Sequence, residues 1–210
     1  MLKLIVRELK SHAPFTFLGA VFGIVLMVTL NRLPHASAER LFYVFHPLHV
    51  LLSALTTATM YKIHQCPLDK KKCNIIWLLC LGYVGSIGIA TLSDSLIPYL
   101  GEMFLNMPHR EMHVGFLEEP WLINAMAFLG VMIAYYNPST KFPHFGHILL
   151  STAASLFHMI MAQGGAMSFG TYLIMLLFLF VSVWLPCCVS DIVFPLLFIK
   201  DKDHQHTHEH

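Results

Sequence analysis

Charged residues are scarce in this sequence. Asp, Glu, Lys and Arg make up 12% of its 210 residues, and the formal net charge is +1. The sequence shows no basic patch with interleaved aromatic residues, no phosphate-binding glycine loop and no Ser-His-Asp signature. We therefore expect no nucleic-acid partner and no soluble nucleotide chemistry.

Cysteine is also rare, and its five positions suggest no pairing scheme. Cys66 and Cys73 are expected in a cytoplasmic loop, Cys80 lies in an apolar stretch, and Cys187 and Cys188 are adjacent. No disulfide framework can be derived from that spacing.

Apolar residues, in contrast, are abundant, at 56% of the chain with a mean hydropathy of +0.64. A helix needs roughly 20 mostly apolar residues to cross a bilayer. Stretches of about that length predict an all-α, polytopic membrane protein with six transmembrane helices, at about residues 14–30, 41–61, 75–100, 121–136, 144–161 and 171–199.

The basic residues predict the orientation, because Lys and Arg in short loops stay on the cytoplasmic side. Of the 13 Lys and Arg residues, all but three fall on the side of the two termini. The exceptions are Arg32, Arg40 and Arg110. Both termini are therefore predicted to be cytoplasmic, in a multi-pass protein of the inner membrane. The alternative is that the first apolar stretch is a cleaved signal peptide ending at Ala36-Ser37-Ala38.

Two motifs occur twice. Residues 46–53 read HPLHVLLS and 144–151 read HFGHILLS; residues 93–100 read SDSLIPYL and 190–197 read SDIVFPLL. The second copies follow the first by 98 and 97 residues, so both motifs recur in the same order at nearly the same spacing. A weaker match places Gly130 over Gly19, with an offset of 111.

The motifs divide the chain into a first three-helix repeat at 1–105, a second at 106–200 and a His-rich tail at 201–210. A repeat with three crossings forces its second copy to enter the membrane from the opposite side. The predicted fold is therefore a 3+3 inverted repeat, an architecture typical of secondary transporters with a site near the bilayer midplane.

The first repeated motif predicts metal ligands. Histidines three residues apart share one face of a helix, so His46 with His49, and His144 with His147, can each offer two imidazoles to one ion. The alternative is a hydrogen-bonded or capping pair, because Pro47 and Pro143 are placed as in the first turn of a helix.

The second motif places Asp94 and Asp191 inside long apolar runs, where an ionised side chain is costly and usually functional. The alternative is a protonated acid bonded to a neighbouring helix. Pro98 and Pro195, four residues after the aspartates, are expected to interrupt the helices.

Glutamates extend the predicted site. Glu119, with Glu118 beside it, is expected to join the outer half-site, and Glu8 the inner one. Two imidazoles with two carboxylates match a divalent cation, and the mixed ligand set favours Zn²⁺, Fe²⁺, Mn²⁺, Co²⁺ or Ni²⁺ over Na⁺ or K⁺.

Cysteines and a tail supply further candidate ligands. Cys187 and Cys188 are either softer ligands or small buried apolar residues. The tail is either a native metal-binding tract or an expression tag; its histidines are His204, His206, His208 and His210. The remaining histidines have no partner in the other repeat and are assigned to packing or interfacial positions: His12, His35, His64, His109, His113 and His158.

The sequence thus predicts a transporter of a divalent transition-metal ion, with zinc as the first ion to test. Its partners would be the lipid bilayer and the metal ion, and a homodimer is left open. The alternatives are a membrane-embedded metalloenzyme that uses the same ligands, and a proton-coupled transporter of a small solute.

Overall fold

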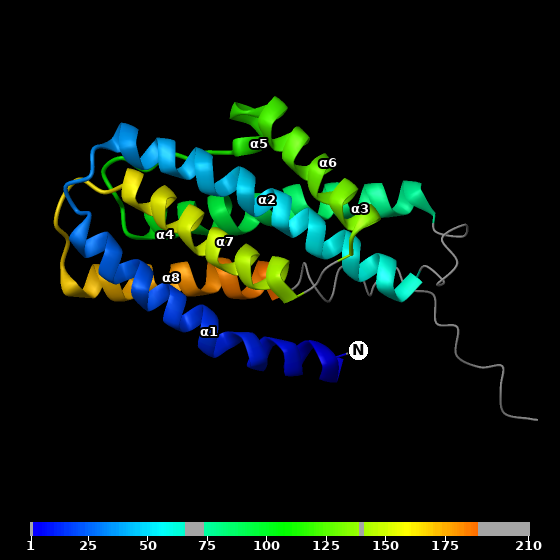
Figure 1. Cartoon of the computed structure of the whole chain (residues 1–210). Coiled ribbons are helices and arrows are strands. Elements are labelled where there is room, and N and C mark those ends of the chain that lie inside the picture. The colour runs from blue at the N-terminus through cyan, green and yellow to red at the C-terminus, as the bar shows by residue number, and fades with distance from the viewer. Residues whose placement is uncertain (1, 66–73, 139–140, 189–210) are drawn as a thin grey trace, which may run out of the picture.

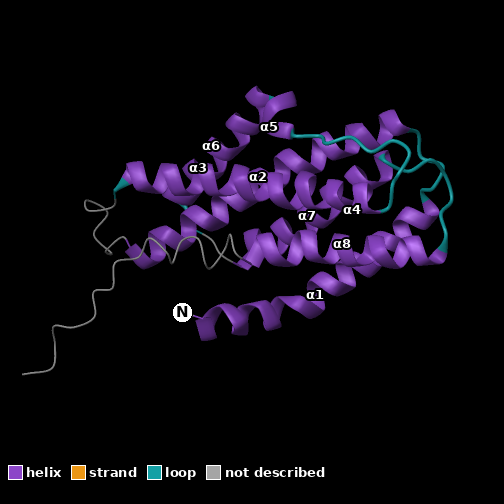
Figure 2. Ribbon diagram, turned by 180° about the vertical axis from the view of Figure 1, so that it is seen from behind, coloured by secondary structure: helices purple, strands orange, loops and turns teal. Residues whose placement is uncertain are grey.

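The computed structural model describes residues 2–65, 74–138 and 141–188, and these residues form helices and connecting loops without a strand. The main helices run back and forth along one bundle axis (Figures 1 and 2). In chain order they are α1 (Leu2–Thr29), α2 (His35–Gln65), α3 (Ile75–Thr91), η2 (Leu92–Leu96), α4 (Ile97–Phe104), α5 (Gly115–Glu118), α6 (Pro120–Tyr136), α7 (Lys141–Met161) and α8 (Phe169–Cys188). The predicted all-helical class is confirmed.

Four helical segments are long and apolar enough to cross a membrane: His12–Thr29, His35–Ile63, Ile75–Phe104 and Phe169–Cys187. The apolar helices Pro120–Tyr136 and Gly146–Met161 are shorter. Large apolar side chains such as Leu18, Phe22 and Val84 point outward and are more than half exposed, whereas several histidines and serines and two carboxylates, Asp94 and Glu102, lie inside. That polarity suits a lipid environment, so the chain is a membrane-embedded protein.

Proline positions differ from expectation. Pro47, expected in the first turn of a helix, lies inside α2, and Pro14 lies inside α1. An internal proline leaves a carbonyl of the preceding turn without its hydrogen bond, and α1 bends along its length (Figure 1). The start of α3 is more conventional, because the Asn74 side chain caps it by accepting bonds from the backbone N–H groups of Ile76 and Trp77.

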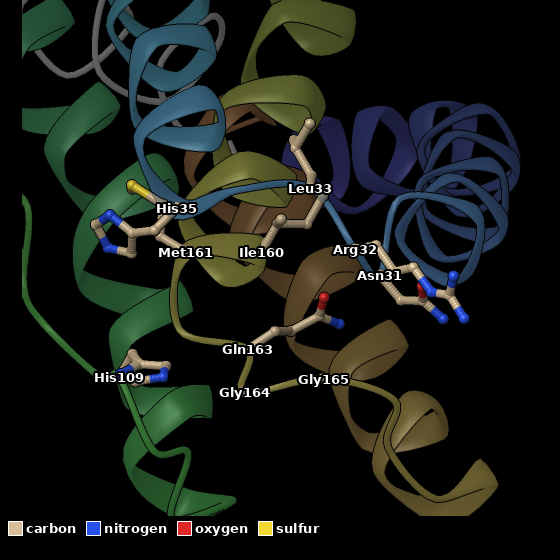
Figure 3. A pocket seen from close by; sticks show the side chains of 10 residues that line it. All are labelled: Asn31, Arg32, Leu33, His35, His109, Ile160, Met161, Gln163, Gly164 and Gly165. Carbon is tan, nitrogen blue, oxygen red and sulfur yellow. The ribbon is translucent and has the colours of Figure 1, made fainter.

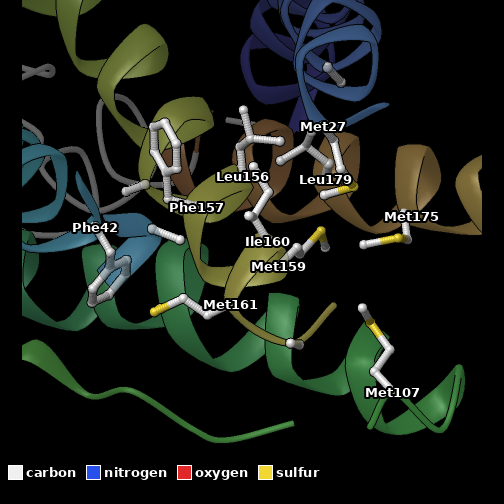
Figure 4. Packing of buried hydrophobic residues seen from close by; sticks show 14 residues of the cluster. Met27, Phe42, Met107, Leu156, Phe157, Met159, Ile160, Met161, Met175 and Leu179 are labelled. Carbon is white, nitrogen blue, oxygen red and sulfur yellow. The ribbon is translucent and has the colours of Figure 1, made fainter. Parts of the chain in front are cut away.

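Helices α2 and α7 form the centre of the bundle. A methionine-rich cluster surrounds one end of α7, where side chains from α1, α2 and α8 meet it (Figure 4). Its flexible thioethers fill gaps between helices that differ in tilt. On the other face of α2, Gly130 of α6 comes so close that a Cβ there would lie 2.3 Å from the Leu51 carbonyl oxygen.

Gly130 therefore predicts a stability contrast. Gly130→Ala should destabilise the protein by about 1–3 kcal/mol, because α6 must move away from α2 to relieve the clash. Gly88→Ala is the matched control, since a Cβ at Gly88 meets nothing within 4 Å. The thermal midpoint of detergent-purified protein should fall for the first variant only, and equal midpoints would show that the α2–α6 contact is looser than described.

Candidate metal centre

The helix that carries Asp94 changes its winding at that residue. Leu92–Leu96 form a π-helical turn, in which the Ile97 N–H bonds to the Leu92 carbonyl. Pro98 has no N–H to offer to the carbonyl four residues before it, that of Asp94. The interruption expected from this proline thus takes the form of a π turn, which brings Ser93, Asp94 and Ser95 together into the interior.

Four side-chain donors surround the Asp94 carboxylate. His46 Nδ1 and His49 Nδ1, both from α2, lie 2.9 and 2.7 Å from Oδ2. The hydroxyls of Ser93 and of Ser151 on α7 donate to Oδ1 at 2.6 and 3.0 Å. All of these groups are buried, so one carboxylate joins α2, η2 and α7 at the centre of the bundle.

These hydrogen bonds define the charge and the tautomers. If both histidines donate, Asp94 accepts four hydrogen bonds and needs no proton of its own, which favours the ionised carboxylate. Each neutral histidine then carries its proton on Nδ1 and leaves Nε2 as an acceptor or ligand atom. A carboxylate that holds the outer nitrogen of a histidine is the usual support of a metal ligand.

The two histidines present Nε2 to different surroundings. The His46 ring stacks on Phe42, with centroids 5.1 Å apart, and is covered by Gly115, where a Cβ would lie 2.6 Å from Nε2. The Nε2 of His49 is buried and makes no hydrogen bond with any described residue. Of these two histidines, only His49 therefore has an Nε2 that can meet a further ligand.

The groups near His49 that could bind an ion with it are His147 and Cys187. The rings of His49 and His147 have centroids 5.0 Å apart, and one ligand atom each from His49, His147 and Cys187 lie within 4.8 Å of one another. All three residues are buried. Tetrahedral zinc with bonds of 2.0–2.3 Å would draw such atoms to roughly 3.5 Å, so the three side chains would close by about an ångström around an ion.

The structure thus brings some of the predicted site residues together and places others apart from them. It places His46, His49 and Asp94 in one hydrogen-bonded group, and adds His147 and Cys187 beside His49. Glu119 is exposed between α5 and α6, away from the Asp94 hydrogen bonds. The Glu118 carboxylate lies instead 3.5 Å from His113 Nδ1.

Other predicted ligands lie outside the part of the molecule that the structure describes. Glu8, His144 and Cys188 belong to helices, but their side chains are not described. Asp191 and the tail histidines lie beyond residue 188, the last that is described.

The sequence did not single out a second buried group, formed by Glu102, His158 and His113. His158 Nδ1 lies 2.7 Å from Glu102 Oε1, with both side chains fully buried. Two spacings could have indicated it: Glu102 follows Asp94 by eight residues, and His158 follows His147 by eleven. Both spacings are close to whole numbers of helical turns, so each pair shares one helix face.

Comparison with known proteins gives no relative: no family model, no curated protein and no solved structure matches the chain. We therefore infer the function from the geometry of the site.

The hydrogen bonds to Asp94 predict that this residue orients ligands and does not bind the ion. Asp94→Asn should lower metal affinity by about 10–100-fold, the usual cost of removing such a support, whereas His49→Ala should abolish binding at this site. Ser95→Ala is the control, because its buried hydroxyl makes no hydrogen bond with any described residue. Competition with a chromogenic chelator measures all three, and complete loss in Asp94→Asn would mean that the carboxylate is a ligand itself.

Proposed function

We propose that this protein is a membrane transporter of a divalent transition-metal ion, with zinc the first ion to test. The observation that carries the proposal is that His49, whose Nδ1 is bonded to Asp94 and whose buried Nε2 makes no hydrogen bond with a described residue, offers a ligand atom within 4.8 Å of those of His147 and Cys187. Two imidazoles and a thiolate suit zinc and other soft or borderline ions, and suit sodium, potassium, magnesium and calcium poorly.

Charge supports a divalent ion. Ionised Asp94 and a Cys187 thiolate carry two negative charges within a buried and apolar bundle, and the described residues of η2, α7 and α8 near them include no Lys or Arg. A buried charge without compensation is unfavourable. One divalent cation neutralises the two charges, and its binding would displace the thiol proton.

The helix contacts support the inverted repeat. If α1, α2 and α3–α4 correspond to α6, α7 and α8, the packing of α6 on α2 has its counterpart in the packing of α1 on α7. The packing of α3 on α6 has its counterpart in that of α8 on α1. Gly130 faces α2, and Gly19, its match in the sequence, faces Thr152 of α7. The proposed ion site lies between the repeat-related helices α2 and α7, where alternating access requires it.

Six membrane crossings are part of the proposal. Besides the four long segments, α6 has 17 residues and α7 has 21, which is the range for a transmembrane helix. Six crossings with the observed alternation of directions would keep both termini on one side, and the distribution of Lys and Arg makes that side cytoplasmic.

A metalloenzyme is the second candidate. The observation in its favour is that three protein ligands leave a tetrahedral ion with one open position, as in catalytic zinc sites. Water bound there would be activated for hydrolysis. The two candidates differ in whether the ion leaves: an enzyme retains it, whereas a transporter exchanges it with both sides of the membrane.

The decisive experiment is metal analysis followed by flux. Protein shortened after Lys202, so that the tail histidines do not contribute, should bind about one equivalent of zinc, and His49→Ala should lose it. His109→Ala, an exposed loop histidine, should bind as the wild type does. Absence of any binding to zinc, iron, manganese, cobalt or nickel would overturn the proposal.

Sealed vesicles then separate the candidates. A transporter moves zinc into vesicles at a rate that falls to background in His49→Ala. Stoichiometric zinc that never crosses the vesicle membrane would reject transport and favour the enzyme.

A further inference from the structure

Glu102 and His158 form a second acid–histidine pair, separate from the proposed ion ligands. Glu102 lies on α4 and His158 on α7, with 2.7 Å between Oε1 and Nδ1. Because they follow Asp94 and His147 by about two and three helical turns, they lie farther along the same two helices. The metal centre does not use them.

The tautomer of His158 is determined by a backbone group. The N–H of His113 donates to His158 Nε2 at 3.3 Å. Nε2 therefore carries no proton, and the proton of His158 resides on Nδ1, where it is donated to Glu102. A second proton on His158 Nε2 would displace the N–H of His113, so His158 holds two protons only in passing, while it transfers one from Nδ1 to Glu102.

The remaining protonation site is Glu102 itself. Its Oε2 is buried and makes no hydrogen bond with any described residue. An ionised Glu102 beside a neutral His158 would leave one buried negative charge, which is costly at membrane depth. Helix α8, which packs against α4, has no acidic or basic residue between Phe169 and Cys188, and the other carboxylate on this face, Asp94, is two turns away. A proton on Oε2 removes the charge and preserves both hydrogen bonds.

A series of histidines connects this pair with the surface. A surface pocket of about 400 Å³ opens at the bundle end, where the α1–α2 turn meets the loops at 105–114 and 162–168 (Figure 3). His35 lines this pocket, and its ring centroid is 6.4 Å from that of His113. The rings of His113 and His158 are 5.6 Å apart. Three imidazoles thus lead from the pocket to Glu102.

His113 is suited to pass a proton onward. Burial lowers its pKa below the usual value, and the neighbouring His158 acts in the same direction, against the opposing charges of Glu111 and Glu39. Glu118, 3.5 Å from His113 Nδ1, has a pKa raised by its own burial. At neutral pH His113 is therefore mainly uncharged and can accept a proton at one nitrogen while it releases another.

We propose that Glu102 is a proton-binding site, supplied from the loop-end pocket through His35, His113 and His158, and that its proton is the coupling ion of the transporter. The coupling role rests on the proposed function. The proton site does not, because it is defined by residues other than the proposed ion ligands.

Infrared difference spectroscopy tests the site in metal-free, detergent-purified protein. The wild type should show the carbonyl stretch of a protonated carboxylic acid at pH 7, and Glu102→Gln should lose that band. Glu111→Gln, an exposed loop residue, is the control and should retain it. Glu102→Asp guards against misfolding, because it should shift the band without removing it. A wild type without the band, or a band unchanged in Glu102→Gln, would overturn the proton site.

Two further measurements test the supply route and the coupling. After a pH jump the band should change more slowly in His113→Phe, which keeps a ring but cannot carry a proton; an unchanged rate would reject the route.

In vesicles, Glu102→Gln should bind zinc with wild-type affinity but lose the acceleration of zinc flux by a pH gradient. Retained acceleration would reject coupling. A normal carboxyl band in protein that binds no metal would leave the proton site standing while the transport proposal fails.

Discussion

The buried carboxylate of Asp94 is the constraint on which the rest of the structure depends. A negative charge at the centre of an apolar bundle persists only if donors surround it, and here the donors come from α2, η2 and α7. The helices must therefore meet at one point. The π turn rotates Asp94 inward, and the Ser155 hydroxyl bonds the Ser93 carbonyl within that turn, which holds α7 in place.

This arrangement reverses the polarity of a water-soluble protein. Outward-facing side chains on α1, α3 and α8 are apolar, and the interior contains two acid–histidine groups in succession along η2, α4 and α7. Such groups are expensive in a membrane and persist where they bind or move ions. The first group presents a ligand nitrogen, whereas the second presents a bare carboxyl oxygen. The ligand nitrogen suits a metal ion, and the carboxyl oxygen suits a proton.

The helical class could be predicted from the sequence, and Asp94, His46, His49 and His147 could be named as candidate site residues, because composition and a repeated motif report local properties. The sequence could not predict which ring nitrogen of His46 or His49 faces a ligand, since that depends on how α2 is rotated against η2. Cys187 was ambiguous for the same reason: a cysteine on an apolar helix becomes a ligand only through its neighbours. Glu102 and His158 escaped notice because their partnership joins helices distant in sequence, without a repeated motif to mark it. Pro47 was misplaced because tertiary packing outweighs the local cost of a proline inside a helix.

The π turn at Leu92–Leu96 has a mechanical consequence. It holds one residue more than an α-helical turn, and one residue corresponds to about 100° of rotation around a helix axis. If the turn were rewound as α-helix, α4 would rotate by that angle relative to α3. Asp94 lies within this turn and Glu102 on α4 beyond it, so the two carboxylates could not both keep their present histidine partners. A change of winding in this one backbone segment would therefore alter the histidine contacts of Asp94, of Glu102 or of both.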